Sequence, residues 1–181
     1  MTTEATSAAA GRAGLVFTLF DANGNGVIEA DDFELMGQRV LAAAEGSDEA
    51  RKAALLASLR NWWTTLATEL DADQDGRIDP AEFNAVVLAP ERFGAALDAF
   101  AVALSALGDP DGDGRIERPL FIALMRAIGF ETPNVNALFD AFGPDDGDRI
   151  TVDVWAAGIR DYYDPAKAGI PGDALVGDPA T

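Results

Sequence analysis

Four twelve-residue segments of this chain have the same layout, in which acidic residues and glycines are concentrated and an isoleucine occupies the eighth position. They are residues 21–32, 71–82, 109–120 and 143–154. Together they make up about a quarter of the 181 residues but hold 17 of the 31 acidic residues. Charge that serves solubility alone is spread over exposed faces, so this clustering in loops of fixed length favours a bound cation.

The composition excludes several classes of function. The chain has 13 Lys and Arg against 31 Asp and Glu, a formal net charge of −18 that repels phosphate backbones and anionic lipid headgroups. It has no cysteine, and therefore no disulfide or thiolate site, and no histidine, the usual general base and a common zinc ligand. We therefore expect no enzymatic activity, no nucleic-acid partner and no membrane partner.

The second segment, DADQDGRIDPAE, follows the calcium-loop pattern D-x-[DN]-x-[DN]-G-x5-E at every position. Alternating carboxylates can point at one centre, Gly76 allows the positive φ of the turn, and the twelfth residue is long enough to bind through both oxygens. A set of oxygen ligands selects Ca²⁺ or Mg²⁺ over zinc or copper. We expect the Arg77 side chain to face solvent as an incidental charge. The predicted ligands are Asp71, Asp73, Asp75, the Arg77 carbonyl, Asp79 and Glu82.

The residues around this loop predict a helix on each side. Trp63, Leu66 and Leu70 recur at helical spacing up to the loop, and Asp79 with Glu82 is typical of a capping box at a helix start. A helix, a twelve-residue loop and a helix make an EF-hand. The other segments have the same frame, although the helical periodicity before the third is weak. The isoleucines expected to bridge the loops, first with second and third with fourth, are Ile28, Ile78, Ile116 and Ile150.

These observations predict an all-α EF-hand fold with two pairs of hands in one compact unit. We expect an N-terminal pair over residues 1–95, a C-terminal pair over 96–164 and a Gly/Pro-rich tail over 165–181. The sequence shows neither a secretory signal nor an apolar run long enough to span a membrane, which indicates a cytoplasmic protein.

The first loop departs from the calcium-loop pattern at one place, because its twelfth residue is aspartate rather than glutamate. Asp32 is one methylene shorter and tends to bind through a single oxygen, which shifts the preference of the loop toward Mg²⁺. We predict that this loop also binds an ion. Its predicted ligands are Asp21, Asn23, Asn25, the Val27 carbonyl, Glu29 and Asp32.

The third and fourth loops are impaired. The fourth has Gly143 and Val154 at its two anchoring positions, so we predict that it supports its partner loop and holds no ion. The third ends in Leu120 and lacks the bidentate carboxylate, which leaves two alternatives, a weak site or a solvated Asp-Gly turn. Its candidate ligands are Asp109, Asp111, Asp113, the Arg115 carbonyl and Glu117.

Over residues 13–176 the chain resembles calerythrin and the sarcoplasmic calcium-binding proteins. The resemblance rests on the frames of four EF-hands, on the long interval between the first two loops, and on the segments DANGNGVIEADDFE and IRDYY. It implies a compact cytosolic protein that binds Ca²⁺ and acts as a buffer. In such relatives the second hand is often the lapsed one, whereas here the second loop is the most complete.

Two other uses of such acidic motifs fit the sequence less well. A phosphotransferase aspartate in the segment DADQD would follow a buried strand, but helical periodicity precedes it. Dockerin-like modules have two calcium repeats without full entering helices, against the four frames here. The aromatic pairs Trp62/Trp63 and Tyr162/Tyr163 are expected at the core and its rim rather than in a substrate platform.

Two functions remain open, a Ca²⁺ buffer or modest-range modulator, and a Ca²⁺ sensor that exposes a hydrophobic surface to an unidentified protein target. Sensors present adaptable, methionine-rich grooves, and beyond the first residue this chain has only Met36 and Met125. This favours the buffer. We expect Leu175 and Val176 of the tail to pack into the C-terminal half and fill such a groove.

Overall fold

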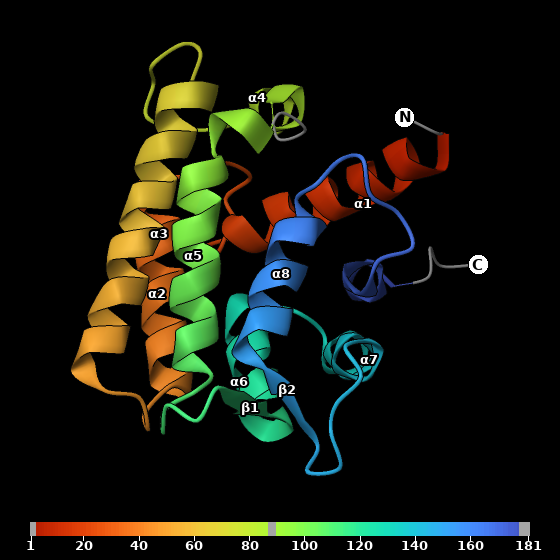
Figure 1. The fold of residues 1–181 in the computed structure, drawn as a ribbon. Coiled ribbons are helices and arrows are strands. Elements are labelled where there is room, and N and C mark those ends of the chain that lie inside the picture. Colours follow the sequence, from red (N-terminus) through yellow and green to blue (C-terminus); the bar gives the residue numbers. More distant parts are fainter. Residues whose placement is uncertain (1–2, 87–89, 178–181) are drawn as a thin grey trace.

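The computed structural model describes residues 3–86 and 90–177, in which eight α-helices, two 3-10 helices and two short strands form (Figure 1). The expected N-terminal pair and tail therefore include residues that lie outside the described part, namely 1–2, 87–89 and 178–181. The elements are α1 (Thr3–Phe20), α2 (Ala30–Ala43), α3 (Glu49–Leu70), α4 (Pro80–Val86), η1 (Pro90–Arg92), α5 (Gly94–Leu107), β1 (Arg115–Glu117), α6 (Arg118–Ile128), α7 (Thr132–Ala141), β2 (Arg149–Thr151), α8 (Val152–Tyr162) and η2 (Pro171–Leu175).

Residues at the ends of the second and fourth loops cap the N-termini of the helices that follow them. At the start of α4, Asp79 Oδ1 accepts a hydrogen bond from the Glu82 amide at 2.8 Å, and Glu82 Oε2 accepts one from the Asp79 amide at 3.1 Å. This reciprocal pair is the predicted capping box, with Pro80 as the first helical residue. At the start of α8, the Thr151 hydroxyl accepts a hydrogen bond from the Val154 amide at 3.1 Å.

The loops pair as predicted. Ile28 and Ile78 form an isolated antiparallel bridge, and β1 pairs with β2 in antiparallel register with Ile116 opposite Ile150. All four isoleucines are buried, so each bridge also anchors its loop pair in the core. The all-α EF-hand fold with paired loops is confirmed.

One hydrophobic core runs through both halves of the molecule. Trp62 of α3 lies at its centre, with ring centroids 6.1 Å from Phe20, 5.3 Å from Phe100 and 5.4 Å from Tyr163. Figure 1 shows α3, α5 and α8 side by side, which brings these rings together. Trp62 and Tyr162 are buried while Trp63 and Tyr163 are partly buried, as expected for core and rim residues.

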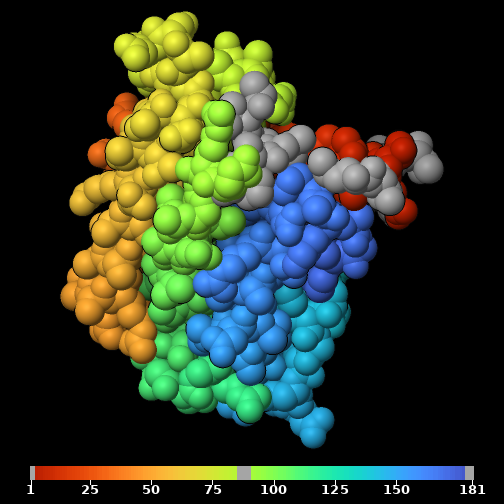
Figure 2. Space-filling model, turned by 45° about the horizontal axis from the view of Figure 1, so that its top comes forward, coloured from red at the N-terminus to blue at the C-terminus, as the bar shows by residue number. Residues whose placement is uncertain are grey.

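The tail covers the C-terminal half. Its helix η2 packs against α7, α8 and α1, and the dark-blue C-terminal segment lies beside the red N-terminal helix in Figure 2. Leu175 is 6% exposed, as predicted, and its carbonyl accepts a hydrogen bond from Asn134 at 3.2 Å. Val176 is 39% exposed, so its predicted burial is wrong, because η2 ends at Leu175 and Val176 lies beyond the helical turn that packs on the core.

A candidate metal centre in the second loop

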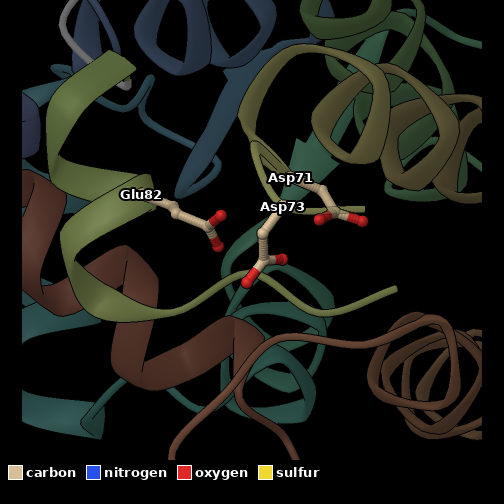
Figure 3. Close-up of side chains that lie close together, drawn as sticks. All are labelled: Asp71, Asp73 and Glu82. Carbon is tan, nitrogen blue, oxygen red and sulfur yellow. The ribbon is translucent and has the colours of Figure 1, made fainter. Parts of the chain in front are cut away.

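The second loop gathers three carboxylates from two elements. Asp71 and Asp73 follow α3, and Glu82 lies in the first turn of α4. One oxygen of each lies within 4.8 Å of the others, and Figure 3 shows the Glu82 and Asp73 carboxylates facing each other with Asp71 beside them. Because Ca²⁺ ligands stand about 2.3–2.6 Å from the ion, two of them are at most about 5 Å apart. The cluster therefore fits an ion of this size.

Backbone amides orient these side chains. Asp71 Oδ1 accepts a hydrogen bond from the Asp75 amide at 3.1 Å, and its Oδ2 accepts one from the Gly76 amide at 2.9 Å. Gly76 has φ +80°, the left-handed conformation that turns the chain around the carboxylate. From the far end of the loop, Glu82 Oε1 accepts a hydrogen bond from the Ala72 amide at 2.9 Å. The loop therefore holds both anchoring carboxylates in fixed positions.

The carboxylates of this loop repel one another. The hydrogen bond from the Asp75 amide lowers the pKa of the Asp73 carboxyl, but desolvation and the charges of Asp75, Glu82 and Asp71 together raise it above its ordinary value. Within residues 3–86 and 90–177, no Lys or Arg forms an ion pair with these four carboxylates. Such a site favours a bound cation.

Three other predicted positions of this loop have separate contacts. Asp75 lies outside the three-carboxylate cluster, and its Oδ1 accepts a hydrogen bond from the Arg77 amide at 2.8 Å. Asp79 is engaged as the N-cap of α4. The Arg77 side chain is exposed as expected, but its charge is not incidental, because its Nε lies 3.0 Å from Glu29 Oε1. The bridge between the two loops brings these side chains together, which the sequence reasoning missed.

The first loop has the same backbone framework. Asp21 Oδ1 accepts from the Asn25 amide at 3.0 Å and Oδ2 from the Gly26 amide at 2.9 Å, as Asp71 does in the second loop. Asn23 Oδ1 also accepts from the Asn25 amide at 3.0 Å, and Asn25 Oδ1 accepts from the Val27 amide at 3.1 Å. Four of the six predicted ligand residues are thus tied into one hydrogen-bonded loop.

Asp32 closes the first loop from a buried position. It is 0% exposed, and its two oxygens accept hydrogen bonds from the Asn23 amide at 3.1 Å and the Glu29 amide at 2.8 Å. Burial raises the pKa of the Asp32 carboxyl and the charges of Asp21 and Glu29 add to this, although the two amide hydrogen bonds oppose it. A cation in the loop would offset that cost. Glu29 itself is shared between Asn25 Nδ2, at 2.8 Å, and Arg77.

The third loop gathers its carboxylates but lacks their partner at the twelfth position. Oxygens of Asp109, Asp111 and Asp113 lie within 4.8 Å of one another. Leu120 and Glu117 instead border a hollow of about 210 Å³ beside them. Arg149 also borders this hollow, and its Nη1 lies 3.5 Å from Asp113 Oδ2. A protein cation thus already lies at this carboxylate cluster.

The fourth loop is a tight turn. The Asp145 amide donates to the Arg149 carbonyl at 2.9 Å, the Asp148 amide donates to the Asp145 carbonyl at 2.9 Å, and Asp145 Oδ1 accepts from the Gly147 amide at 2.9 Å. Asp148 has φ +58° at the sixth position, where the first three loops have glycine. Among the described residues of this loop no group of three carboxylates converges.

The EF-hand family model matches residues 15–36 and 68–87, which contain the first and second loops and parts of their flanking helices. These two segments of the chain are similar to the EF-hand. No curated protein matches it by sequence. In the part of the chain described here, no helix is both long and apolar enough to cross a bilayer.

Solved structures show which EF-hand proteins share this fold. A Streptomyces coelicolor calcium-binding protein is 25% identical, with a TM-score of 0.72 over 88% of this chain and 99% of that one. The amphioxus sarcoplasmic calcium-binding protein is 19% identical, with a TM-score of 0.64 over 96% and 98% of the two chains. The ctenophore photoprotein berovin, whose three Ca²⁺-binding loops bind Mg²⁺, is 16% identical, with a TM-score of 0.64 over 84% and 86%. The fold is therefore like that of the sarcoplasmic calcium-binding proteins.

Proposed function

We propose that this EF-hand protein takes up Ca²⁺ in its first two loops and acts as a cytoplasmic Ca²⁺ buffer or modest-range modulator, without enzymatic activity. The observation that carries the proposal is the convergence of one oxygen each of Asp71, Asp73 and Glu82 within 4.8 Å, at a place where no Lys or Arg of the described residues forms an ion pair with them. In the metal-free protein these carboxylates repel one another. A bound Ca²⁺ neutralises them and orders the helices on both sides of the loop.

The first loop is proposed as the site with the greater tolerance for Mg²⁺. Asp32 has a short side chain, and both of its carboxylate oxygens accept hydrogen bonds from backbone amides. Two of the other predicted ligands are the neutral side-chain amides of Asn23 and Asn25. A loop with fewer charges and a monodentate closing residue suits six ligands in octahedral geometry. Mg²⁺ in the cell would then occupy this loop until Ca²⁺ rises.

The third loop is proposed as a weak site at most. Its three clustered carboxylates supply part of a Ca²⁺ shell, but Leu120 contributes no oxygen and Arg149 offers Asp113 a competing positive charge. Under this proposal the main ion load lies in residues 1–95, and the C-terminal pair over 96–164 supports the core.

The scarcity of exposed large hydrophobic side chains among the described residues favours the buffer over the sensor. Among the described residues, the large hydrophobic side chains that are exposed are Val102, Val154 and Val176, which lie on three different segments. Leu175 of the tail lines an apolar cavity together with Leu138, Ile159 and other core residues. The tail therefore packs where a target helix of a sensor would have to enter.

Calorimetric titration with Ca²⁺, repeated in millimolar Mg²⁺, tests the proposal. We expect two Ca²⁺ per chain, with one of the two binding events weakened by Mg²⁺. At a hundredfold excess over Kd, bound Ca²⁺ adds about 2.7 kcal/mol of stability, which raises the Tm of a chain of this length by about 5–10 °C. A large Ca²⁺-dependent rise in the fluorescence of a hydrophobic dye would instead support the sensor.

A further inference from the structure

The side chain of Arg118 makes the densest set of charged contacts in the C-terminal half. Its Nε donates to Asp148 Oδ1 at 3.0 Å and Oδ2 at 2.8 Å, and its Nη2 donates to Asp148 Oδ1 at 2.8 Å and to Asp140 Oδ1 at 2.6 Å. Its Nη1 donates to Asn136 Oδ1 at 3.2 Å. The guanidinium carbon lies 4.4 Å from the ring centroid of Phe139. The planar group is thus held on its edges by oxygens and on one face by a ring.

All of these partners belong to the fourth hand. Asn136, Phe139 and Asp140 lie on α7, its entering helix, and Asp148 lies in its loop. Arg118 itself comes from the third hand, as the first residue of α6. One positive charge from a neighbouring hand therefore binds three oxygen-bearing side chains of a hand whose own loop gathers no carboxylate cluster.

We propose that the Arg118 guanidinium is a built-in cation of the fourth hand, which ties its entering helix to its loop without a metal ion and keeps the C-terminal pair ordered when Ca²⁺ is absent. This goes beyond Ca²⁺ binding by the first two loops and does not depend on it. Under this proposal the fourth hand is ordered without a metal ion because of three residues, Arg118, Asp140 and Asp148.

The backbone of the fourth loop supports this role. Asp148 occupies a left-handed position, φ +58°, where the other three loops have glycine with φ between +80° and +90°. A side chain there carries a conformational cost that aspartate tolerates better than most residues. Both oxygens of the Asp148 carboxylate accept hydrogen bonds from Arg118.

Electrostatics agree with the geometry. The hydrogen bonds that Arg118 donates lower the pKa of Asp148, and the same bonds to Asp148 and Asp140 raise the pKa of Arg118, so each charged form stabilises the other. Two further arginines act in the same loop pair, since Arg115 Nη1 lies 2.5 Å from Asp145 and Arg149 Nη2 lies 3.6 Å from it. Arginines therefore pair with carboxylates of both C-terminal loops, whereas within residues 3–86 and 90–177 no Lys or Arg forms an ion pair with a carboxylate of the second loop.

Hydrogen–deuterium exchange of the full chain in chelator tests the inference. For the wild-type protein we expect α7 and β2 to be equally protected with and without Ca²⁺, while loop 71–82 loses protection on chelation. Arg118→Gln is expected to speed exchange in α7 and β2 at least tenfold in chelator. Arg126→Gln, on an exposed position of the same helix, is the matched control and is expected to change nothing.

Removal of the unpaired acids separates a charge role from a packing role. In Arg118→Gln the carboxylates of Asp140 and Asp148 face each other without a cation, so the triple variant R118Q/D140N/D148N is expected to recover protection that R118Q has lost. Added Mg²⁺ or Ca²⁺ at millimolar concentration is expected to slow exchange in R118Q but not in the triple variant. If R118Q fails to fold, recovery of folding in the triple variant gives the same test, and a triple variant that also fails to fold would contradict a charge role.

Three results would overturn the inference. The first is loss of protection of α7 and β2 in the wild-type protein on chelation to the same extent as loop 71–82. The second is an Arg118→Gln variant that exchanges like the Arg126→Gln control. The third is a triple variant as poorly protected as R118Q, which would show that Arg118 acts through its bulk rather than its charge.

Discussion

The amides of Ile28 and Ile78 each donate a hydrogen bond to the carbonyl of the other, both at 2.9 Å. This bridge joins the first loop to the second at their eighth positions, and one residue away on each side Arg77 pairs with Glu29 at 3.0 Å. Glu29 is a predicted ligand of the first loop, so the second loop holds one of the first loop's oxygens in place. The two N-terminal loops are therefore expected to bind ions as a coupled pair.

The coupling gives the first prediction. Arg77→Gln removes the ion pair with Glu29 while keeping the backbone bridge and the Arg77 carbonyl position. We expect the two Ca²⁺ binding events to become less interdependent, with a change of about fivefold or more in the ratio of their stepwise constants. Calorimetry of the wild-type and variant proteins measures this. Arg60→Gln, an exposed change on α3, serves as the control, and equal ratios in all three proteins would exclude coupling through this pair.

A third strong site is expected from one substitution. Leu120→Glu places a carboxylate at the twelfth position, beside the hollow that borders Asp111 and Asp113. We expect calorimetry to count three Ca²⁺ per chain instead of two. Leu120→Gln, with the same length and no charge, is expected to leave the count at two. A variant that folds as judged by circular dichroism yet still binds two ions would show that Arg149 or the loop geometry blocks the site.

The local parts of the candidate site could be predicted from the sequence. Asp71, Gly76 and Glu82 stand within one loop, so their spacing alone fixes which side chains face the centre, and the capping box at Asp79 follows from the same residues. The pairing of loops through their isoleucines was predicted for the same reason. Which oxygens hold the ions stays a prediction.

The parts that depend on distant contacts could not be predicted. Arg118 meets Asp140 and Asp148 across 22 and 30 residues, and no spacing rule links them. The periodicity before the third loop is weak because α5 is buried on several faces, so its apolar residues do not form one stripe, yet the helix is 14 residues long. Hydrophobic periodicity predicts a helix that is buried on one face better than a helix that is buried on several faces.

Arg12 makes another set of contacts between residues far apart in the sequence, and we expect them to contribute to the stability of the fold. It is 2% exposed on α1 and donates to the carbonyls of Tyr162 at 2.7 Å, Asp164 at 2.9 Å and Lys167 at 2.9 Å, and to Asp173 Oδ1 at 2.5 Å. Arg12→Met would leave these tail acceptors without a donor. We expect a loss of about 3 kcal/mol and a Tm lower by about 6–12 °C.

The same variant tests whether the tail covers apolar surface. In Arg12→Met the tail is expected to become more sensitive to protease and the protein to bind more hydrophobic dye, because Leu175 of the tail forms part of the wall of an apolar cavity. Differential scanning calorimetry and limited proteolysis measure both effects. Arg126→Met, at an exposed position, is the control. A Tm equal to that of the control would contradict a fastening role for Arg12.

The pH dependence of the C-terminal half follows from Asp148. The hydrogen bonds from Arg118 hold its pKa below the ordinary value, so the folded state prefers the ionised carboxylate more than the unfolded chain does. The stabilisation is therefore present above the unfolded-state pKa of about 3.9 and is lost as the pH falls through the lower folded-state pKa. Asp140 shares the same guanidinium.

A carboxyl-carbon NMR titration checks this prediction. The Asp148 resonance is expected to titrate below pH 3.9 in the wild-type protein and to return toward the ordinary value in Arg118→Gln. In the Arg126→Gln control the midpoint is expected to stay low. An Asp148 midpoint that is the same with and without Arg118 would contradict the assignment of the shift to this arginine.

The most direct measurement counts bound Ca²⁺ by equilibrium dialysis of the purified wild-type protein beside Glu82→Gln and the exposed control Glu34→Gln. The neutral amide at the twelfth position removes the charge of Glu82 and its bidentate binding, so we expect two ions per chain in the wild type and the control and one in Glu82→Gln. A wild-type protein recovered without Ca²⁺ at millimolar free concentration, or equal counts in all three proteins, would contradict the account.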